Sequence, residues 1–273
     1  MTRARSRAAL LTSFFVACGG PLPSSPDPTA PTQISPPSPA PTAEATPAAA
    51  PRATSDDNER SEADRALDPS RHPVEMLAFF GIAPGQHVAE LGAGTGYTTE
   101  LLARAVGPSG VVYGQNPKWL LEKFAESPWA ERLRKPSMKN VRRLDRDFDD
   151  PFPPEVKDLD AVISILFYHD TVWLGADRDR MNRAVFAALR SGGVYGIVDY
   201  SALATRGIKD VKTIHRIEDA FVKAEVIRAG FKLEGEAAFL RNSADARDWN
   251  DAPNAEGERH GTSDRFVLKF VKP

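Results

Sequence analysis

Two stretches of the chain carry residue types at spacings that could do chemistry. The first is Glu90-Leu-Gly-Ala-Gly-Thr-Gly96, in which glycine occupies every second position after an acidic residue. Glycines at this spacing let the backbone turn sharply and approach a ligand with no Cβ in the way. The second is Tyr168-His169-Asp170, in which a histidine that can transfer protons near neutral pH stands beside a carboxylate. The sequence therefore predicts a ligand-binding loop and a candidate acid–base site.

The glycine spacing distinguishes this loop from two common phosphate-binding loops. The glycines alternate, whereas the dinucleotide fingerprint reads G-x-G-x-x-G, and a Walker-type loop would need Gly-Lys-Ser/Thr, which this sequence does not have. A short apolar run precedes the loop, and a segment with helical apolar spacing follows it, so the unit is strand, loop, helix. The N–H groups that begin such a helix face whatever the loop binds. An ordinary glycine-rich turn is the alternative interpretation.

The elements that must position these residues alternate between strands and helices. A helix over residues 72–80, capped by Asp68 or Ser70 and ended by Gly81, is expected before the first strand. The longest apolar run, 159–167, predicts a central strand that is buried on both faces. The last two strand-like runs have no helix between them and should pair antiparallel. The pattern predicts an α/β protein with a mostly parallel sheet.

This combination resembles the class I S-adenosylmethionine (SAM)-dependent methyltransferases, whose motif I is an acidic strand end followed by G-x-G-x-G. The resemblance covers about residues 73–273 and implies a Rossmann-like sheet of seven mostly parallel strands, with helices on both faces and a C-terminal antiparallel hairpin. Within the superfamily, the chain is most similar to a poorly characterised group of predicted bacterial methyltransferases. That group shares the Tyr-His-Asp triplet, a His-Arg-Ile-Asp/Glu segment (here 215–218) and the ending found at 263–270.

The resemblance implies a SAM site at the carboxyl ends of the strands, where open parallel sheets bind ligands. The glycine loop and its leading carboxylate would hold the methionine part, the end of the second strand would meet the ribose, and the third loop would border the adenine. The predicted cofactor-binding residues are Glu90, Gly92, Ala93, Gly94, Gly96, Tyr97, Gln115, Asn116, Asp147 and Phe148. The superfamily usually has Asp or Glu at the ribose position, and the amides of Gln115 and Asn116 form weaker, uncharged hydrogen bonds.

The predicted catalytic residues are Tyr168, His169 and Asp170. His169 would take a proton from an oxygen or nitrogen nucleophile, and Asp170 would orient its ring. The alternative is a histidine that closes the strand structurally. The same strand-end rule adds residues 199–200 to the crevice, and His215, at the start of a helix, is a second candidate. The sequence contains no metal-ligand spacing, so no metal is predicted.

The front of the chain predicts export. Residues 1–17 carry three arginines and then an apolar stretch that is too short to span a membrane, as in a signal peptide. The segment 15–18 resembles the lipobox of bacterial lipoproteins, in which the cysteine, here Cys18, is lipidated; a plain signal peptide or a wrongly assigned start are the alternatives. Eleven of the 23 prolines lie between residues 21 and 51, so residues 19–61 are expected to be a disordered linker. The folded domain is expected at 62–273.

Net charge narrows the class of ligand that we expect the protein to bind. The 273-residue chain has a net charge of −2, which offers no electrostatic reason to bind nucleic acid. We expect SAM-dependent methyl transfer to a small-molecule acceptor by a lipid-anchored protein of the cell envelope. One alternative is a catalytically degenerate member that only binds SAM or a partner, which the uncharged ribose position and the cytoplasmic origin of SAM favour. A nucleotide-dependent oxidoreductase is a second alternative, against which the glycine spacing argues.

Overall fold

A computed structural model describes residues 60–253, 255, 257–259 and 261–273. These residues fall within one compact unit, 48–273. The predicted signal sequence with Cys18 and the predicted linker up to residue 59 lie outside the described residues. No helix of the described part is long and apolar enough to cross a membrane.

The folded domain includes two residues that the sequence placed in the linker. The Ser61 side chain accepts a hydrogen bond from the Asp64 N–H and caps the first helix. Arg60 is buried and pairs with Asp68 at 2.6 Å. Ordered packing therefore begins slightly before residue 62.

The core of the domain is a seven-stranded sheet in the order β3-β2-β1-β4-β5-β7-β6. The strands are β1 (His87–Leu91), β2 (Val111–Asn116), β3 (Val141–Asp145), β4 (Leu159–Ile165), β5 (Leu189–Tyr200), β6 (Lys232–Ala237) and β7 (Arg265–Val271). Strands β1 to β5 are parallel, and β7 runs antiparallel to both β5 and β6. This confirms the predicted fold class. The strand order reverses between β1 and β4, the switch point at which such sheets bind ligands.

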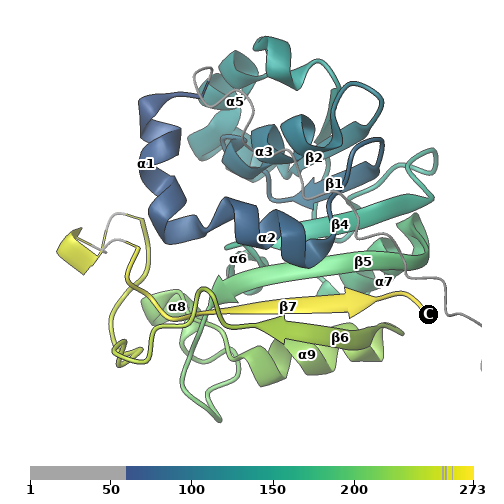
Figure 1. Cartoon of the computed structure of the whole chain (residues 1–273). Helices are drawn as coiled ribbons and strands as arrows, with labels where there is room; N and C mark the ends of the chain where they lie inside the picture. The colour runs from purple at the N-terminus through teal and green to yellow at the C-terminus, as the bar shows by residue number, and fades with distance from the viewer. Residues whose placement is uncertain (1–59, 254, 256, 260) are drawn as a thin grey trace, which may run out of the picture. The chain divides into compact units, whose positions relative to one another are not determined.

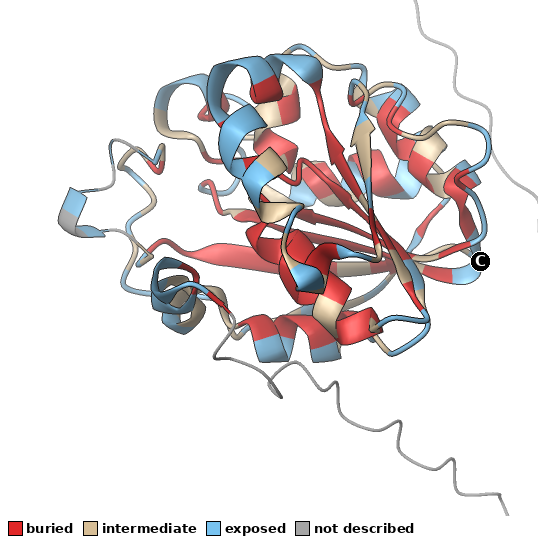
Figure 2. Ribbon diagram, turned by 90° about the horizontal axis from the view of Figure 1, so that it is seen from above, coloured by how far each residue is buried: buried red, intermediate tan, exposed pale blue. Residues whose placement is uncertain are grey.

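Helices cover both faces of the sheet (Figure 1). They are α1 (Glu62–Arg71), α2 (Pro73–Phe80), α3 (Tyr97–Val106), α4 (Lys118–Leu120), α5 (Glu126–Arg132), α6 (Tyr168–Trp173), α7 (Arg178–Ala188), α8 (Val211–Ile214) and α9 (Asp219–Arg228), with a π-helical turn at Leu121–Ala125 and 3-10 turns at Pro136–Met138 and Gly257–Arg259. One apolar cluster joins α2, α3 and α5 to the sheet, and a second joins α7 and α9 to it. Figure 2 shows the buried strands between helices whose outer faces are exposed.

The segment before the first strand differs from the prediction. Neither Asp68 nor Ser70 caps a helix; both lie inside α1, and the chain bends at His72, which has φ 47°. The reason is Pro73, because a proline disfavours helical geometry in the residue before it and begins a new helix well. Gly81 ends α2 as predicted. As a result α1 turns away from α2 and contacts α3 and α5, on the side of the sheet where the parallel strands end (Figure 1).

The central strand also ends earlier than the apolar run suggests. β4 stops at Ile165, and Leu166 adopts a left-handed φ of 55° while its N–H still bonds to the Val198 carbonyl at 2.8 Å. Tyr168-His169-Asp170 then forms the first turn of the short helix α6. This sharp turn places the triplet at the carboxyl edge of the sheet.

Candidate active site

The glycine loop joins β1 to α3, and its three glycines have φ values of 69°, 56° and 88°. A Cβ on Gly92 would lie 2.4 Å from the Phe167 ring. A Cβ on Gly96 would lie 2.4 Å from the Trp129 ring. At Gly94, by contrast, a Cβ would meet no atom of the described chain within 4 Å. Packing and the left-handed backbone require two of the glycines, whereas Gly94 presents open backbone that a ligand can approach.

Side chains at the end of β2 hold the loop in this shape. The Gly92 N–H donates to Gln115 Oε1 at 3.1 Å, and the Gly94 N–H donates to Asn116 Oδ1 at 2.8 Å. Asn116 Nδ2 donates in turn to the Gly94 carbonyl at 3.0 Å, and Gln115 Nε2 donates to the Arg146 carbonyl. Both side chains are fully buried. The two residues predicted to bind ribose thus lie beside the loop, with their amide groups bonded to backbone.

Glu90 is buried at the end of β1, next to the start of α3. Its carboxyl group accepts a hydrogen bond from the Thr99 hydroxyl. Burial raises the pKa of Glu90 to about 8, while hydrogen bonds from two threonines and the positive charge of Arg71 act in the opposite direction. A cation that reached this carboxyl group would stabilise its charged form.

Tyr97, the first residue of α3, contacts the N-terminal helix α1. Its hydroxyl donates to Asp68 Oδ1 at 2.6 Å, and Arg60 pairs with the same carboxylate. The guanidinium of Arg71 lies over the Tyr97 ring, 5.0 Å from its centroid. The tyrosine therefore ties the glycine loop to the helix above it.

Buried ion pairs strengthen this attachment. Arg132 bonds to Asp64 of α1 at 2.8 Å and to Glu100 of α3 at 2.7 Å. Lys135 adds a second cation at 2.8 Å from Glu100. We call the contacts of Asp64 with Arg132 and of Asp68 with Tyr97 the α1 latch. The latch holds α1 as a lid over the start of α3.

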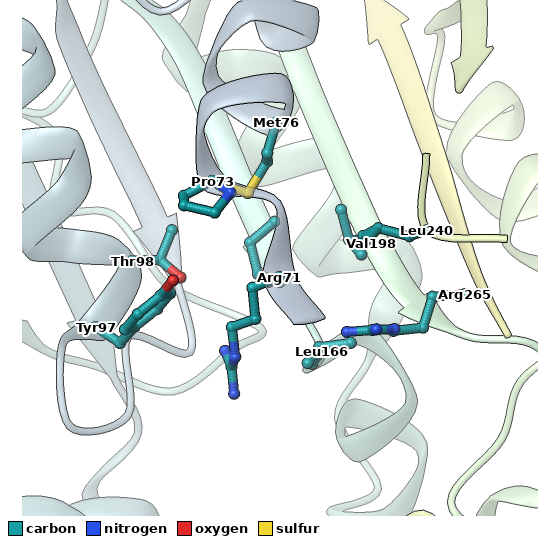
Figure 3. Close-up of a pocket in the computed structure, with 10 residues that line it drawn as sticks. Arg71, Pro73, Met76, Tyr97, Thr98, Leu166, Val198, Leu240 and Arg265 are labelled. Carbon is teal, nitrogen blue, oxygen red and sulfur yellow. The ribbon is translucent and has the colours of Figure 1, made fainter. Parts of the chain in front are cut away.

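A small cavity lies between α2, the start of α3 and the sheet, beside the end of α1 (Figure 3). It is lined by Arg71, Pro73, Met76, Tyr97, Thr98, Ile165, Leu166, Val198, Leu240 and Arg265. Its volume of about 10 Å³ holds roughly one water molecule. In Figure 3 the half-buried Arg71 side chain extends between Tyr97 and Leu166.

The third loop places an aromatic wall beside the glycine loop. The buried Phe148 packs on Phe167 with ring centroids 5.3 Å apart, and Phe167 covers Gly92. Asp147 is exposed, and the alternative Asp149 lies 3.8 Å from Arg180. Of the residues predicted to meet adenine, Phe148 is the one that the structure places next to the loop.

The second part of the candidate site is a cluster of His169, Asp170 and His215. The first two lie in the first turn of α6, and His215 ends α8 with a left-handed φ of 53°. Asp170 Oδ1 lies 3.3 Å from His169 Nε2 and 3.9 Å from His215 Nδ1. The two imidazole centroids are 5.5 Å apart. The fold thus brings a predicted pair of residues together with the second candidate histidine.

Asp199, near the end of β5, orients the His169 ring. It is fully buried, accepts the His169 backbone N–H at 2.8 Å, and lies 2.7 Å from Nδ1. Because an ionised carboxylate only accepts hydrogen bonds, Nδ1 carries a proton and Nε2 faces Asp170. The orienting role that the sequence assigned to Asp170 therefore falls to Asp199, which makes the shorter contact.

Charges within the cluster shift pKa values in different directions. Burial lowers the pKa of His169, but the negative charges of Asp199 and Asp170 outweigh it and raise this pKa to about 9. Burial, helped by the charge of Asp199, raises the pKa of Asp170. Burial and repulsion by His169 lower the pKa of His215. At neutral pH the two imidazoles therefore differ, with His169 charged and His215 neutral.

The structure does not bring the Tyr168 hydroxyl into this cluster. The side chain is fully buried, donates to Glu225 at 2.9 Å and accepts from Asn182 at 2.8 Å. Burial raises the pKa of its phenol well above the ordinary value. Tyr168 anchors α6 to α7 and α9, and the contacts described for it are with the core.

Sequence reasoning missed two residues of the site. Arg71 reaches the cavity only because the chain bends at His72, and no local motif marks that bend as functional. Trp173 is 46% exposed and stacks on His215 with centroids 6.4 Å apart. Its spacing of four residues from His169 on one helix was the available signal.

The chain has recognisable relatives. Residues 68–149, which contain the glycine loop and β1 to β3, match the family model of protein-L-isoaspartate(D-aspartate) O-methyltransferase. Among solved structures, the chain is similar to a SAM-dependent methyltransferase from Aquifex aeolicus, with 17% identity, a TM-score of 0.54, and coverage of 77% of this chain and 97% of that one.

Two further structures show the same architecture. A predicted sarcosine dimethylglycine methyltransferase from Galdieria sulphuraria is 15% identical, with a TM-score of 0.54 and coverage of 79% and 89% of the two chains. The 4+2 cyclase SpnF is also 15% identical, with a TM-score of 0.53 and coverage of 75% and 80%. This chain therefore has the Rossmann-like fold of SAM-dependent methyltransferases.

Proposed function

We propose that this protein binds SAM at the glycine loop and transfers its methyl group to a small-molecule acceptor held at the His169 cluster. The observation that carries the proposal is a buried acid and a cation near the start of α3, which form a pair of opposite charges once the acid ionises. Glu90 lies on one side as a buried carboxyl group, and Arg71 lies on the other as a half-buried cation that lines the cavity. The family match over 68–149 and the shared fold support the same cofactor.

These charges fit the amino-acid end of SAM. An ammonium group supplies the cation that the buried Glu90 carboxyl group requires to ionise. A carboxylate beside it would accept from Arg71 and from the first N–H groups of α3, which have no partner within the helix. The open backbone of Gly94 lies in the same loop. The residues present therefore suit the methionine part of the cofactor.

The adenine and ribose end of the cofactor would meet aromatic and amide side chains. The aromatic wall of Phe148 and Phe167 suits a flat base. The Gln115 and Asn116 amides are already bonded to backbone, so a ribose would share or replace one of those contacts. When bound, SAM supplies a methyl group activated by a positively charged sulfur.

The acceptor would lie at the His169 cluster, because β4 is the neighbour of β1 and its carboxyl end opens into the same crevice. The neutral imidazole of His215 can accept the proton that a hydroxyl group loses as it is methylated, and the charged His169 can hold the acceptor oxygen by a hydrogen bond. The exposed Trp173 beside His215 offers a flat apolar surface. This combination suits a small, partly aromatic acceptor that carries a hydroxyl group.

Titration of the full-length protein with SAM tests the cofactor assignment. We expect Arg71→Ala to bind SAM at least about tenfold more weakly, since a hydrogen bond to a charged group contributes about 1.5–3 kcal/mol. Arg65→Ala, on the exposed side of the same helix, is the matched control and should bind normally. A folded wild-type protein that binds NADH instead of SAM, or neither, would overturn the proposal.

A catalytically degenerate SAM-binding module is the second candidate. The observation that favours it is that the Gln115 and Asn116 amides, at the predicted ribose position, are already bonded to backbone. The two candidates differ in whether bound SAM gives up its methyl group to an acceptor. Methyl transfer from labelled SAM to any member of a panel of lipids, quinols and small phenols supports the enzyme, and SAM binding with no transfer supports the module.

We also propose that the protein is exported and anchored by a lipid on Cys18. The support is the sequence alone, namely the short basic and apolar leader and the lipobox-like residues before Cys18. Cys18→Ser should release the protein from the membrane fraction or block its processing. Mass spectrometry that finds an unmodified mature N-terminus next to Cys18 would refute the lipid anchor.

A further inference from the structure

We propose that His169, Asp170 and His215 form a binding site for a divalent transition-metal ion of the zinc type. The spacing of these residues along the chain gives no sign of a metal site, because they come from two separate helices. The fold brings one ligand atom of each residue within 4.8 Å of the others.

The geometry is close to that of a zinc site. Tetrahedral donors with bonds of about 2.0–2.1 Å lie roughly 3.4 Å apart. Asp170 Oδ1 already lies 3.3 Å from His169 Nε2 and 3.9 Å from His215 Nδ1. A small rotation of the His215 side chain, which sits on a short helix at the surface, would bring the third pair into range.

The ligand types also suit such an ion. Two imidazoles and one carboxylate are the set that open zinc sites and other mononuclear sites use. Metal-bound imidazoles commonly donate their other ring N–H to a carboxylate, which fixes the tautomer and the ring orientation. Asp199, fully buried and 2.7 Å from His169 Nδ1, makes that contact. It leaves Nε2 directed toward the other two ligands.

The cluster is accessible from one side. The His169 side chain is 4% exposed, whereas those of Asp170 and His215 are 29% and 22% exposed. Three protein ligands leave at least one coordination position for a further ligand. That position suits an oxygen ligand such as water, a hydroxyl group or a carboxylate.

Direct binding of Co²⁺ and Zn²⁺ to the full-length protein tests the site without SAM or an acceptor. All variants carry Cys18→Ser, since a thiolate would also bind these ions. We expect one Co²⁺ per chain with visible absorption bands, displaced by one Zn²⁺. His215→Ala and Asp170→Asn should each weaken binding by at least about 100-fold, and Asp199→Asn, which removes the supporting carboxylate, by about 10- to 100-fold. His72→Ala, a histidine paired with Glu75 outside the cluster, should bind as the parent does.

The result separates a metal site from a structural ion-pair cluster. A parent protein that takes up no more metal than its His215→Ala variant, with both folded by circular dichroism, overturns the proposal. Equal binding by the Asp170→Asn variant would overturn the ligand assignment as well. Because no cofactor or acceptor is present, the outcome does not depend on whether the protein transfers methyl groups.

Discussion

Replacement of Glu90 by glutamine should change stability and cofactor binding in opposite directions. Burial raises the pKa of Glu90 from its ordinary 4.5 to about 8. Because the folded value is the higher one, the protonated acid is favoured in the fold, and its contribution to stability is lost as pH rises from about 4.5 to 8. At pH 7 the unfolded chain holds this group ionised and the fold holds it protonated. One pKa unit corresponds to about 1.4 kcal/mol, so the difference costs on the order of 3 kcal/mol of stability.

The Glu90→Gln variant removes this cost. We expect it to be more stable than the wild type at pH 7 by up to about 3 kcal/mol, with a difference that shrinks toward zero near pH 4.5. The same change removes the charged partner of the SAM ammonium group. SAM binding should therefore weaken by about 10- to 100-fold, the equivalent of about 1.5–3 kcal/mol. Urea unfolding between pH 4.5 and 8 and calorimetric titration with SAM measure the two effects.

Glu100 is the matched control, a second buried glutamate on the same strand–loop–helix unit. Burial raises its pKa, but hydrogen bonds from Lys135 and two arginines outweigh it, so the pKa is lowered. Its stabilising contribution is present at neutral pH and is lost as pH falls through the carboxyl range. Glu100→Gln should thus destabilise the protein at pH 7. If Glu90→Gln destabilises equally at low and high pH, or keeps full SAM affinity, Glu90 only packs and the reasoning fails.

Three other substitutions probe the loop, the cluster and the lid. Gly94→Ala should weaken SAM binding at least tenfold, with a stability cost of about 1–2 kcal/mol for a left-handed residue. Gly92→Ala should destabilise the fold more, because its new Cβ meets an aromatic ring. Unchanged SAM affinity in a folded Gly94→Ala protein would contradict this prediction. His169→Ala should lower methyl-transfer turnover at least about tenfold with SAM affinity little changed, and full turnover would mark the histidine as structural. Tyr97→Phe, which removes a bond to Asp68, should cost about 1 kcal/mol and speed proteolysis within α1, whereas unchanged cleavage would show that the bond does not hold the lid.

Much of the fold was predictable because it depends on local patterns. Apolar runs of strand length, separated by helical segments, predicted five parallel strands. The last two runs have no helix between them, which predicted the antiparallel β6–β7 pair. The turn residues of the glycine loop were equally clear, since alternating glycines have few other uses between a strand and a helix. The end of the helix before β1 was also predictable, because Gly81 ends α2 in the left-handed conformation that favours glycine.

The parts that could not be predicted depend on contacts between distant segments. The sequence placed Asp199 and His215 near the crevice, but it assigned the orientation of His169 to Asp170. Asp199 makes that contact instead, because β5 lies beside β4. The amides of β2 are a further example. Asn116 bonds both the N–H and the carbonyl of Gly94, which a carboxylate, having no donor, cannot do. The uncharged residue at this position thus has a structural reason that no single stretch of sequence reveals.

We expect access to the cavity to depend on ionic strength, because the α1 latch consists partly of ion pairs. Arg71, the last residue of α1, lines the cavity, so movement of α1 away from Arg132 would widen the entrance for a ligand. Lifting exposes Asp64 and Asp68 to ions, whose screening acts over about 8 Å at physiological salt and about 3 Å at 1 M. Higher salt therefore favours the open lid and shortens the residence time of a bound ligand. For a protein exported as proposed, retention of the ligand would follow the salinity of the surroundings.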